Sequence, residues 1–347
     1  MPTAARALSP LLWCLCTSLA MAQPAPLGGW PQHARARPMA PVVTPGPYAY
    51  QGPPSDAVVR VEKNGQLLSP ADETVQYRSP QGAQYRSLGE NDAIRQARTA
   101  LGGDYANTAA VIALGVAQSG QRKFREAIET LTRGLEGLQQ RTREQRVLQQ
   151  REVQLRVEEA MLLRWRGHRY LSVREFAKAN ADLLRGLALD STNYGILFHL
   201  GVLRFAQGRH AEAADYFRRA QPVAPDGGER AASTDWLWMA LMRSGRASEA
   251  AAMLAERIDQ RPDPKPAPPG YAYLSRLKLY RGELSPDSLI SPADTDPTSR
   301  ATLYYGLGNW YLVRGDSTRA RAAFRAAVQS GGWAGFGFIV AERELMR

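Results

Sequence analysis

The 347-residue sequence contains only two cysteines and four histidines. Both cysteines, Cys14 and Cys16, lie in the first 22 residues, so the chain after them has no disulfide, no thiol nucleophile and no thiolate metal site. No run beyond that segment is long and apolar enough to span a membrane. These absences exclude a disulfide-stapled fold, a cysteine enzyme and a polytopic membrane protein.

Residues 1–22 have the pattern of a secretory signal peptide. One arginine precedes an apolar stretch, and Ala20-Met21-Ala22 has the small-x-small form of a cleavage site before Gln23. We expect cleavage there and a periplasmic or secreted location, with a membrane anchor as the weaker alternative. A bulky Trp13 before Cys14 argues against a lipidated cysteine.

Catalytic patterns are also missing. The four histidines are dispersed, the carboxylates are scattered, and HExxH, CxxC, GxSxG and phosphate-loop patterns do not occur. The sequence therefore predicts a protein that is not an enzyme and that has no cofactor and no metal site. An enzyme with an unrecognised site in 57–107 is the alternative.

The charge is unequal, with 44 Lys and Arg against 33 Asp and Glu, a formal net charge of +11. Most of the basic residues are Arg, and together with abundant Ala and Gly this bias is typical of a GC-rich genome. An exported protein rarely meets RNA, so we expect no nucleic-acid partner. Anionic lipid headgroups, cell-wall polymers or an acidic protein are better candidates for the charge.

The segment 301–334 organises the second half of the chain. Large residues recur every three or four positions from Tyr304 to Tyr311, and again around Phe324 after a break at Gly315-Asp316. Each half has the period of a helix with one apolar stripe. The small residues Gly308 and Ala320 stand where two such helices would cross closely. The segment therefore predicts a helical hairpin.

Other copies of this pattern occur in the same register. The eighth position is Gly115, Gly167, Gly201 and Gly308 in the copies at 108–141, 160–193, 194–227 and 301–334, and Trp238 in the copy at 231–264. The pattern resembles the 34-residue tetratricopeptide repeat (TPR). That resemblance implies an all-α, right-handed superhelical solenoid, with a degenerate unit at 265–300. An unrelated helical bundle is the alternative.

Three further segments complete the chain. Residues 23–56 are rich in Pro, Gly and Ala and predict a disordered tether, or a Pro-rich ligand for another domain. Residues 57–107 predict a small segment with a β-hairpin at Asn64-Gly65 and a helix from Glu90 to Leu101. An excess of 18 residues in 137–160 predicts that one or both flanking helices are longer, and 335–347 predicts a C-terminal capping helix.

In TPR proteins the first helix of each repeat lines a concave groove that binds a peptide or a helix. Carried onto this sequence, that resemblance implies a partner-binding groove that is apolar, aromatic and Met-rich, with Arg at its edges. A C-terminal segment or a neighbouring repeat filling this groove is the alternative. The groove residues are Arg164, His168, Phe198, Val202, Phe205, Asp235, Met239, Met242, Arg243, Tyr305 and Asn309, with Met161, Leu171 and Leu312 beside them.

Residues 160–347 also resemble, more weakly, the NlpI-like TPR adaptors of the bacterial envelope. Together the two resemblances imply an exported scaffold or adaptor that binds segments of other envelope proteins. A structural or assembly subunit of an envelope complex is the alternative. The sequence leaves the identity of the partner and the oligomeric state open.

Overall fold

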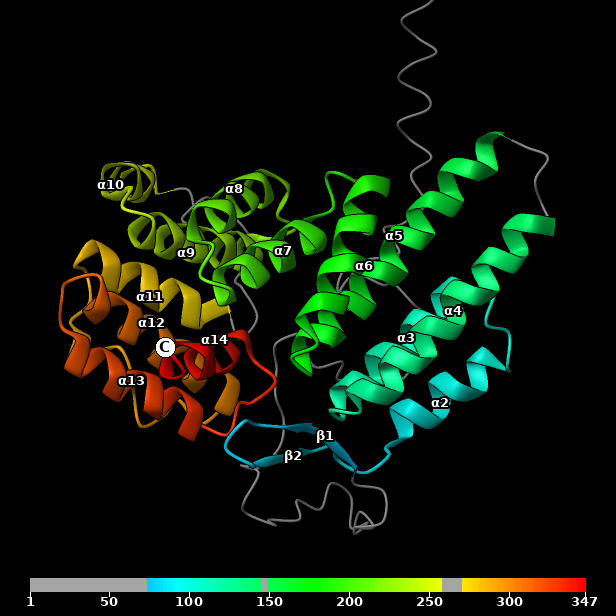
Figure 1. The fold of residues 1–347 in the computed structure, drawn as a ribbon, viewed down its shortest axis with the longest axis horizontal. Coiled ribbons are helices and arrows are strands. Elements are labelled where there is room, and N and C mark those ends of the chain that lie inside the picture. Colours follow the sequence, from blue (N-terminus) through cyan, green and yellow to red (C-terminus); the bar gives the residue numbers. More distant parts are fainter. Residues whose placement is uncertain (1–73, 145–148, 258–269) are drawn as a thin grey trace, which may run out of the picture.

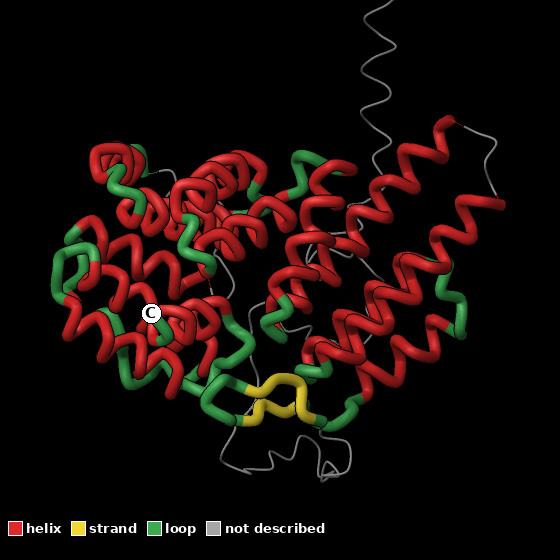
Figure 2. Tube along the Cα trace, viewed as in Figure 1, coloured by secondary structure: helices red, strands yellow, loops and turns green. Residues whose placement is uncertain are grey.

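The computed structural model of this chain describes residues 74–144, 149–257 and 270–347 (Figure 1). The expected signal peptide, the tether and the hairpin at Asn64-Gly65 lie outside these residues. Within them, a single two-stranded sheet accompanies a curved stack of helices (Figure 2). The expected all-α solenoid of helical hairpins is confirmed.

The helices follow one another as antiparallel hairpins, each packed against the next. In chain order the elements are β1 (Val75–Arg78), β2 (Gln84–Arg86), α2 (Asp92–Leu101), α3 (Thr108–Gly120), α4 (Phe124–Glu144), α5 (Gln149–Ser172), α6 (Phe176–Leu189), α7 (Tyr194–Ala206), α8 (His210–Ala220), the 3₁₀ turn η4 (Gln221–Val223), α9 (Gly227–Arg243), α10 (Ala247–Ala255), α11 (Gly270–Arg281), the 3₁₀ turn η6 (Pro286–Ser288), α12 (Pro297–Leu312), α13 (Ser317–Gln329) and α14 (Phe336–Leu345). The first helices α7 and α9 are almost wholly buried, whereas the second helices α8, α10 and α13 each keep an exposed face.

The glycine at the eighth repeat position sets the distance between the two helices of a hairpin. A Cβ at Gly201 would lie 2.6 Å from the Phe217 ring, and one at Gly308 would lie 2.5 Å from the Phe324 ring. Gly167 meets Leu183 in the same way, again 16 residues later in the chain, at 2.8 Å. The repeat register is therefore visible as one recurring contact between a glycine and a large side chain.

Two units depart from this contact. Trp238 replaces the glycine in α9, and its ring stacks on Tyr280 of α11 with centroids 3.7 Å apart. The degenerate unit contributes α11, but within 270–300 the short turn at Pro286–Ser288 stands where a second helix would follow. The indole is thus packed against the first helix of the degenerate unit.

The excess residues in 137–160 lengthen both flanking helices, as the sequence predicts. α4 has 21 residues and α5 has 24, whereas the helices of the next hairpin have 13 and 11. The ends of α4 and α5 extend together beyond the rest of the stack (Figure 1). An ion pair between Arg141 and Glu158 joins the two helices at the base of this arm.

The N-terminal part of the described chain is a hairpin followed by a helix. β1 and β2 pair antiparallel, with Gly82 at a φ of 88° in the turn between them. The expected helix near 90–101 is α2, whose N-cap Asn91 accepts a hydrogen bond from the backbone N–H of Ile94 and which ends at Gly102. The expected hairpin was the one at Asn64-Gly65, and the turn Ser79-Pro80-Gln81-Gly82, which is the sequence signal for this one, was not used.

The hairpin joins the two ends of the stack. Tyr85 lies in a small core with Phe124 of the first repeat and with Trp333 and Phe338 of the C-terminal segment. Its ring lies 5.5 Å from the Trp333 ring and 5.7 Å from the Phe338 ring, measured between centroids. Gln76 meanwhile accepts hydrogen bonds from Arg125 on α4. The first repeat and the C-terminus are therefore held together through β1 and β2.

Replacing Ala213 by Leu tests the repeat register. Ala213 on α8 is fully buried at the close crossing with α7, so a larger side chain should overpack the crossing and cost about 1–3 kcal/mol of stability. Urea unfolding measures this loss. Ala211 is exposed on the same helix, and Ala211→Leu should leave stability within about 0.5 kcal/mol. Equal effects of the two substitutions would contradict the register.

Candidate binding groove

The residues that the sequence assigns to the groove do come together on the inner helices. Arg164 and His168 lie on α5, Phe198 to Phe205 on α7, Asp235 to Arg243 on α9, and Tyr305 and Asn309 on α12. These helices line the inside of the curve (Figure 1). Nine of the eleven side chains are buried, and only Met242 and Arg243 are partly exposed.

The C-terminal helix α14 fills the concave face. It packs against α12 and α13 and reaches α7 on the other side of the curve. Phe336, at its first turn, lies 5.2 Å from the His168 ring and 5.6 Å from the His199 ring. The groove thus already contains a helix of the chain itself.

Ion pairs fix α14 at both of its carboxylates. Arg243 of α9 pairs with Glu344 through two contacts of 3.0 and 3.3 Å, and Arg174 pairs with Glu342 at 3.1 Å. Tyr77 of β1 donates a further hydrogen bond of 3.0 Å to Glu342. Both carboxylates are buried, so these partners compensate the cost of removing them from water.

The expectation of an open groove is therefore wrong. Phe205 should have been exposed, but it is fully buried between Trp236 and Tyr305, at ring distances of 5.3 and 6.3 Å. Phe198, Val202, Met239 and the other buried members of the set are likewise inaccessible in this conformation. The alternative, a groove filled by the C-terminal segment, describes the structure.

Asp235 forms a buried ion pair in the core of the stack. Its carboxylate lies 2.9 Å from the guanidinium of Arg276 on α11, and both side chains are fully buried. Arg276 also donates hydrogen bonds of 3.1 Å to the Thr302 carbonyl and the Tyr280 hydroxyl. A Cβ at Gly306 would overlap this arginine. The sequence missed Arg276 because it lies in the degenerate unit, where the repeat register is hidden.

A second buried arginine lies at the other side of the groove. Gly195 on α7 leaves room for Arg164, since a Cβ there would overlap its guanidinium. Glu229 on α9 accepts a hydrogen bond of 2.7 Å from the Tyr194 hydroxyl. Burial raises the pKa of Glu229 to about 8, although Tyr194 and Arg164 act in the opposite direction.

His168 and His199 form a buried pair beneath Phe336, with ring centroids 4.2 Å apart. Burial first, and then the positive charges of Arg164 and Arg169, lower the pKa of both imidazoles well below the usual 6.5. Both rings are therefore neutral at pH 7 and act as aromatic packing surfaces for α14. A catalytic role would need a substrate-accessible face, and neither ring has one here.

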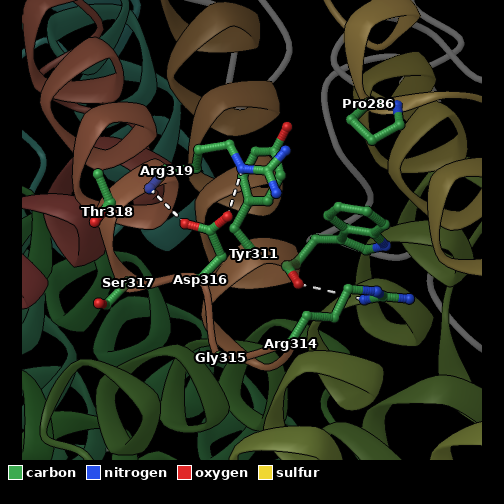
Figure 3. Close-up of a pocket in the computed structure, with 9 residues that line it drawn as sticks. Pro286, Tyr311, Arg314, Gly315, Asp316, Ser317, Thr318 and Arg319 are labelled. Atoms are coloured by element: carbon green, nitrogen blue, oxygen red, sulfur yellow. Dashed lines mark hydrogen bonds and ion pairs between the residues drawn. The ribbon is translucent and has the colours of Figure 1, made fainter.

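The structure has a separate pocket at the turn between α12 and α13. It encloses about 430 Å³ and is lined by Trp310, Tyr311, Arg314 and the segment from Gly315 to Arg319, with Pro286 on the facing side (Figure 3). The sequence predicted no site at this turn.

Within the described residues, no three His, Cys, Asp or Glu side chains gather closely enough to hold a metal ion. The helices described here also include none with the length and apolarity to cross a bilayer.

These features define the class of the protein as a helical-repeat solenoid closed by its own C-terminal helix. Residues 166–228, from α5 to the start of α9, match the family model of the tetratricopeptide repeat (TPR_16). The chain thus contains tetratricopeptide repeats, as the contacts of Gly167 and Gly201 within that segment and of Gly308 beyond it also indicate. No curated protein sequence matches the chain.

Several solved TPR structures are similar to this chain at low identity. YrrB, whose structure is described as that of a TPR protein with an unusual peptide-binding site, is 13% identical with a TM-score of 0.40, over 69% of this chain and 93% of its own. PilF of Pseudomonas aeruginosa is 16% identical (TM-score 0.38, 67% and 92%), and MamA is 17% identical (TM-score 0.36, 58% and 87%). Likenesses this distant add nothing to what the hairpins themselves show.

Removing one partner of the Asp235–Arg276 pair should be far more costly than removing both. Asp235→Ala leaves a buried guanidinium without its carboxylate and should cost about 3–5 kcal/mol. Replacing the pair by Leu and Met should cost much less, because no buried charge then remains. Chemical denaturation of the two variants measures the difference. Equal losses would show that the charges are not coupled.

Acidification should weaken the packing of α14 through the two histidines. When the pKa of a histidine is lower in the folded state, the unfolded state takes up the proton first. The free energy of unfolding therefore decreases as the pH falls below the unfolded pKa of about 6.5. Each histidine should lower the free energy of unfolding by about 1.4 kcal/mol per pH unit in that range. His199→Gln should flatten the pH profile by one such contribution between pH 6.5 and 5. Glu229 and His210 are present in both the original chain and the variant, so their contributions to the pH profile cancel when the two profiles are compared.

A profile of the His199→Gln variant parallel to that of the original chain would contradict this origin of the pH dependence, whatever the overall stability of the variant. Denaturant midpoints at several pH values provide the profile.

Proposed function

We propose that this protein is an exported scaffold that binds segments of other envelope proteins, and that it is not an enzyme. Stacked TPR hairpins offer large rigid surfaces, and protein–protein interaction is the role for which such repeats are suited. The location follows from the signal-peptide pattern of residues 1–22, and the adaptor role from the weaker resemblance to NlpI-like proteins.

One observation supports a binding surface outside the groove. The concave groove contains α14, whose residues from Phe336 to Ala341 are buried and whose two glutamates are paired with arginines of the stack. Exchanging this helix for a partner would expose its apolar surface and break both ion pairs. Partners of the folded protein therefore bind the outer helices and the turns between repeats.

The contacts of the β-hairpin weigh against an enzyme site in the N-terminal segment. The described part of that segment includes β1 and β2, which use Tyr77 and Tyr85 to hold the C-terminal segment and Gln76 to hold α4. These three side chains therefore have structural partners.

Site-specific photo-crosslinking tests this proposal. A photoreactive amino acid is placed at Arg156 on the α4–α5 arm, at Arg321 on α13, and at Met242 on the inner face, and the full chain is irradiated in the native envelope. We expect adducts from the outer positions and none from Met242. Sequencing of the purified protein should give Gln23 as its first residue. Adducts at Met242 alone would show that the groove opens, and an intact Met1 in the cytoplasm would contradict export.

A further inference from the structure

The pocket between α12 and α13 combines aromatic rings with arginines. The Arg314 guanidinium lies 3.9 Å from the centroid of the Trp310 ring, and that of Arg319 lies 4.5 Å from the centroid of the Tyr311 ring. Such stacking holds a guanidinium in place without neutralising it, because the ring carries no charge. The Arg314 guanidinium therefore remains able to attract an anion at the mouth of the pocket, while Arg319 also has a carboxylate beside it.

One acidic side chain lines this pocket, and it is already engaged. Asp316 accepts a hydrogen bond of 2.9 Å from the backbone N–H of Arg319 and pairs with the Arg319 side chain at 2.5 Å, as Figure 3 shows. It caps the start of α13 and so satisfies a backbone donor there. Arg314 donates only to the Trp310 carbonyl, at 3.3 Å, and has no carboxylate partner in the described part of the chain.

The positive charge continues along the outer face of α13. Thr318, which lines the pocket, shares this face with Arg321 and Arg325 at spacings of three and seven residues. Both arginines are exposed, and α13 contains no Asp or Glu. Among the described residues no carboxylate pairs with either of them. Outer helices elsewhere differ, since Arg218 and Arg246 near α8 and α10 share Glu249.

We propose that the pocket and the adjoining face of α13 form a binding site for an acidic segment of a partner protein. Carboxylates of the segment lie along Arg321 and Arg325, and one carboxylate at the pocket contacts Arg314 and Arg319. This site is separate from the groove, and it rests on the proposed scaffold function in that its ligand is a protein segment.

A peptide fits these features better than a membrane surface does. The cations follow the length of one helix and end at an open pocket of about 430 Å³, an arrangement suited to an extended chain with a side chain at one end. A flat lipid surface would contact the arginines of α13 but would leave the aromatic floor of the pocket unused. Carboxylate and guanidinium are also matched in geometry, which favours paired contacts.

Fluorescence anisotropy with the full chain tests the site. The probe is a fluorescein-labelled peptide of alternating Glu and Ala, and the same peptide with Lys in place of Glu is the control ligand. We expect saturable binding of the acidic peptide alone, weakened at high salt because exposed charges are screened. Arg321→Glu combined with Arg325→Glu should weaken binding tenfold or more. Arg314→Gln should weaken it several-fold without altering the circular dichroism spectrum.

The matched control is Arg143→Glu combined with Arg156→Glu, which changes the net charge equally on the exposed α4–α5 arm. Equal weakening by both pairs would overturn the site, because net charge alone would then explain the binding. An absence of saturable binding would also overturn it. Vesicles of phosphatidylglycerol that bind in place of the peptide, and that lose binding with the α13 variant, would assign the face to lipid.

The photo-crosslinking experiment separates failure of this site from failure of the scaffold function. Adducts at Arg156 without adducts at Arg321 would remove the α13 site and leave the scaffold in place. An absence of adducts at every outer position would remove the scaffold function itself.

Discussion

A stack of helical hairpins buries each unit only against its neighbours, so its concave face and its ends remain exposed to water. In this molecule the segment from Trp333 to Glu344 removes that exposure. Its aromatic side chains contact β2, the first repeat and the helices α5 and α7, while its two glutamates pair with Arg174 and Arg243. Contacts between residues far apart in sequence thereby convert a one-dimensional stack into a closed unit. We expect such a unit to unfold as a whole.

The repeats could be predicted from sequence because their contacts are local. Gly201 meets Phe217 within one hairpin, and the spacing of 16 residues recurs in other copies. The state of the groove could not be predicted in this way. Phe198 and Phe205 would show the same helical spacing whether the concave face were open or covered by α14. Whether a face is covered depends on where a segment more than 100 residues later in the chain comes to lie.

Charges were the second place where sequence patterns gave too little information. The excess of arginine was interpreted as a compositional bias, yet Arg174, Arg243 and Arg276 each pair with a buried or nearly buried carboxylate. Arg276 can be buried because Gly306 on the neighbouring helix has no side chain. That glycine appears in the sequence as an ordinary small residue of the α12 stripe, and its partner lies in the unit without a recognisable register. Neither Arg276 nor Gly306 could be interpreted without knowing that the two residues lie in contact.

The closed groove changes which residues can determine specificity. A TPR protein with an open groove selects partners by inner side chains, whereas here those side chains hold α14 and one another. In the proposed scaffold, selection falls to surfaces that packing leaves free to vary, such as the α4–α5 arm and the outer face of α13, which lie at opposite ends of the molecule in Figure 1. Substitutions on these surfaces can change binding with little effect on the core. A scaffold built in this way separates the residues that fold it from the residues that bind its partners.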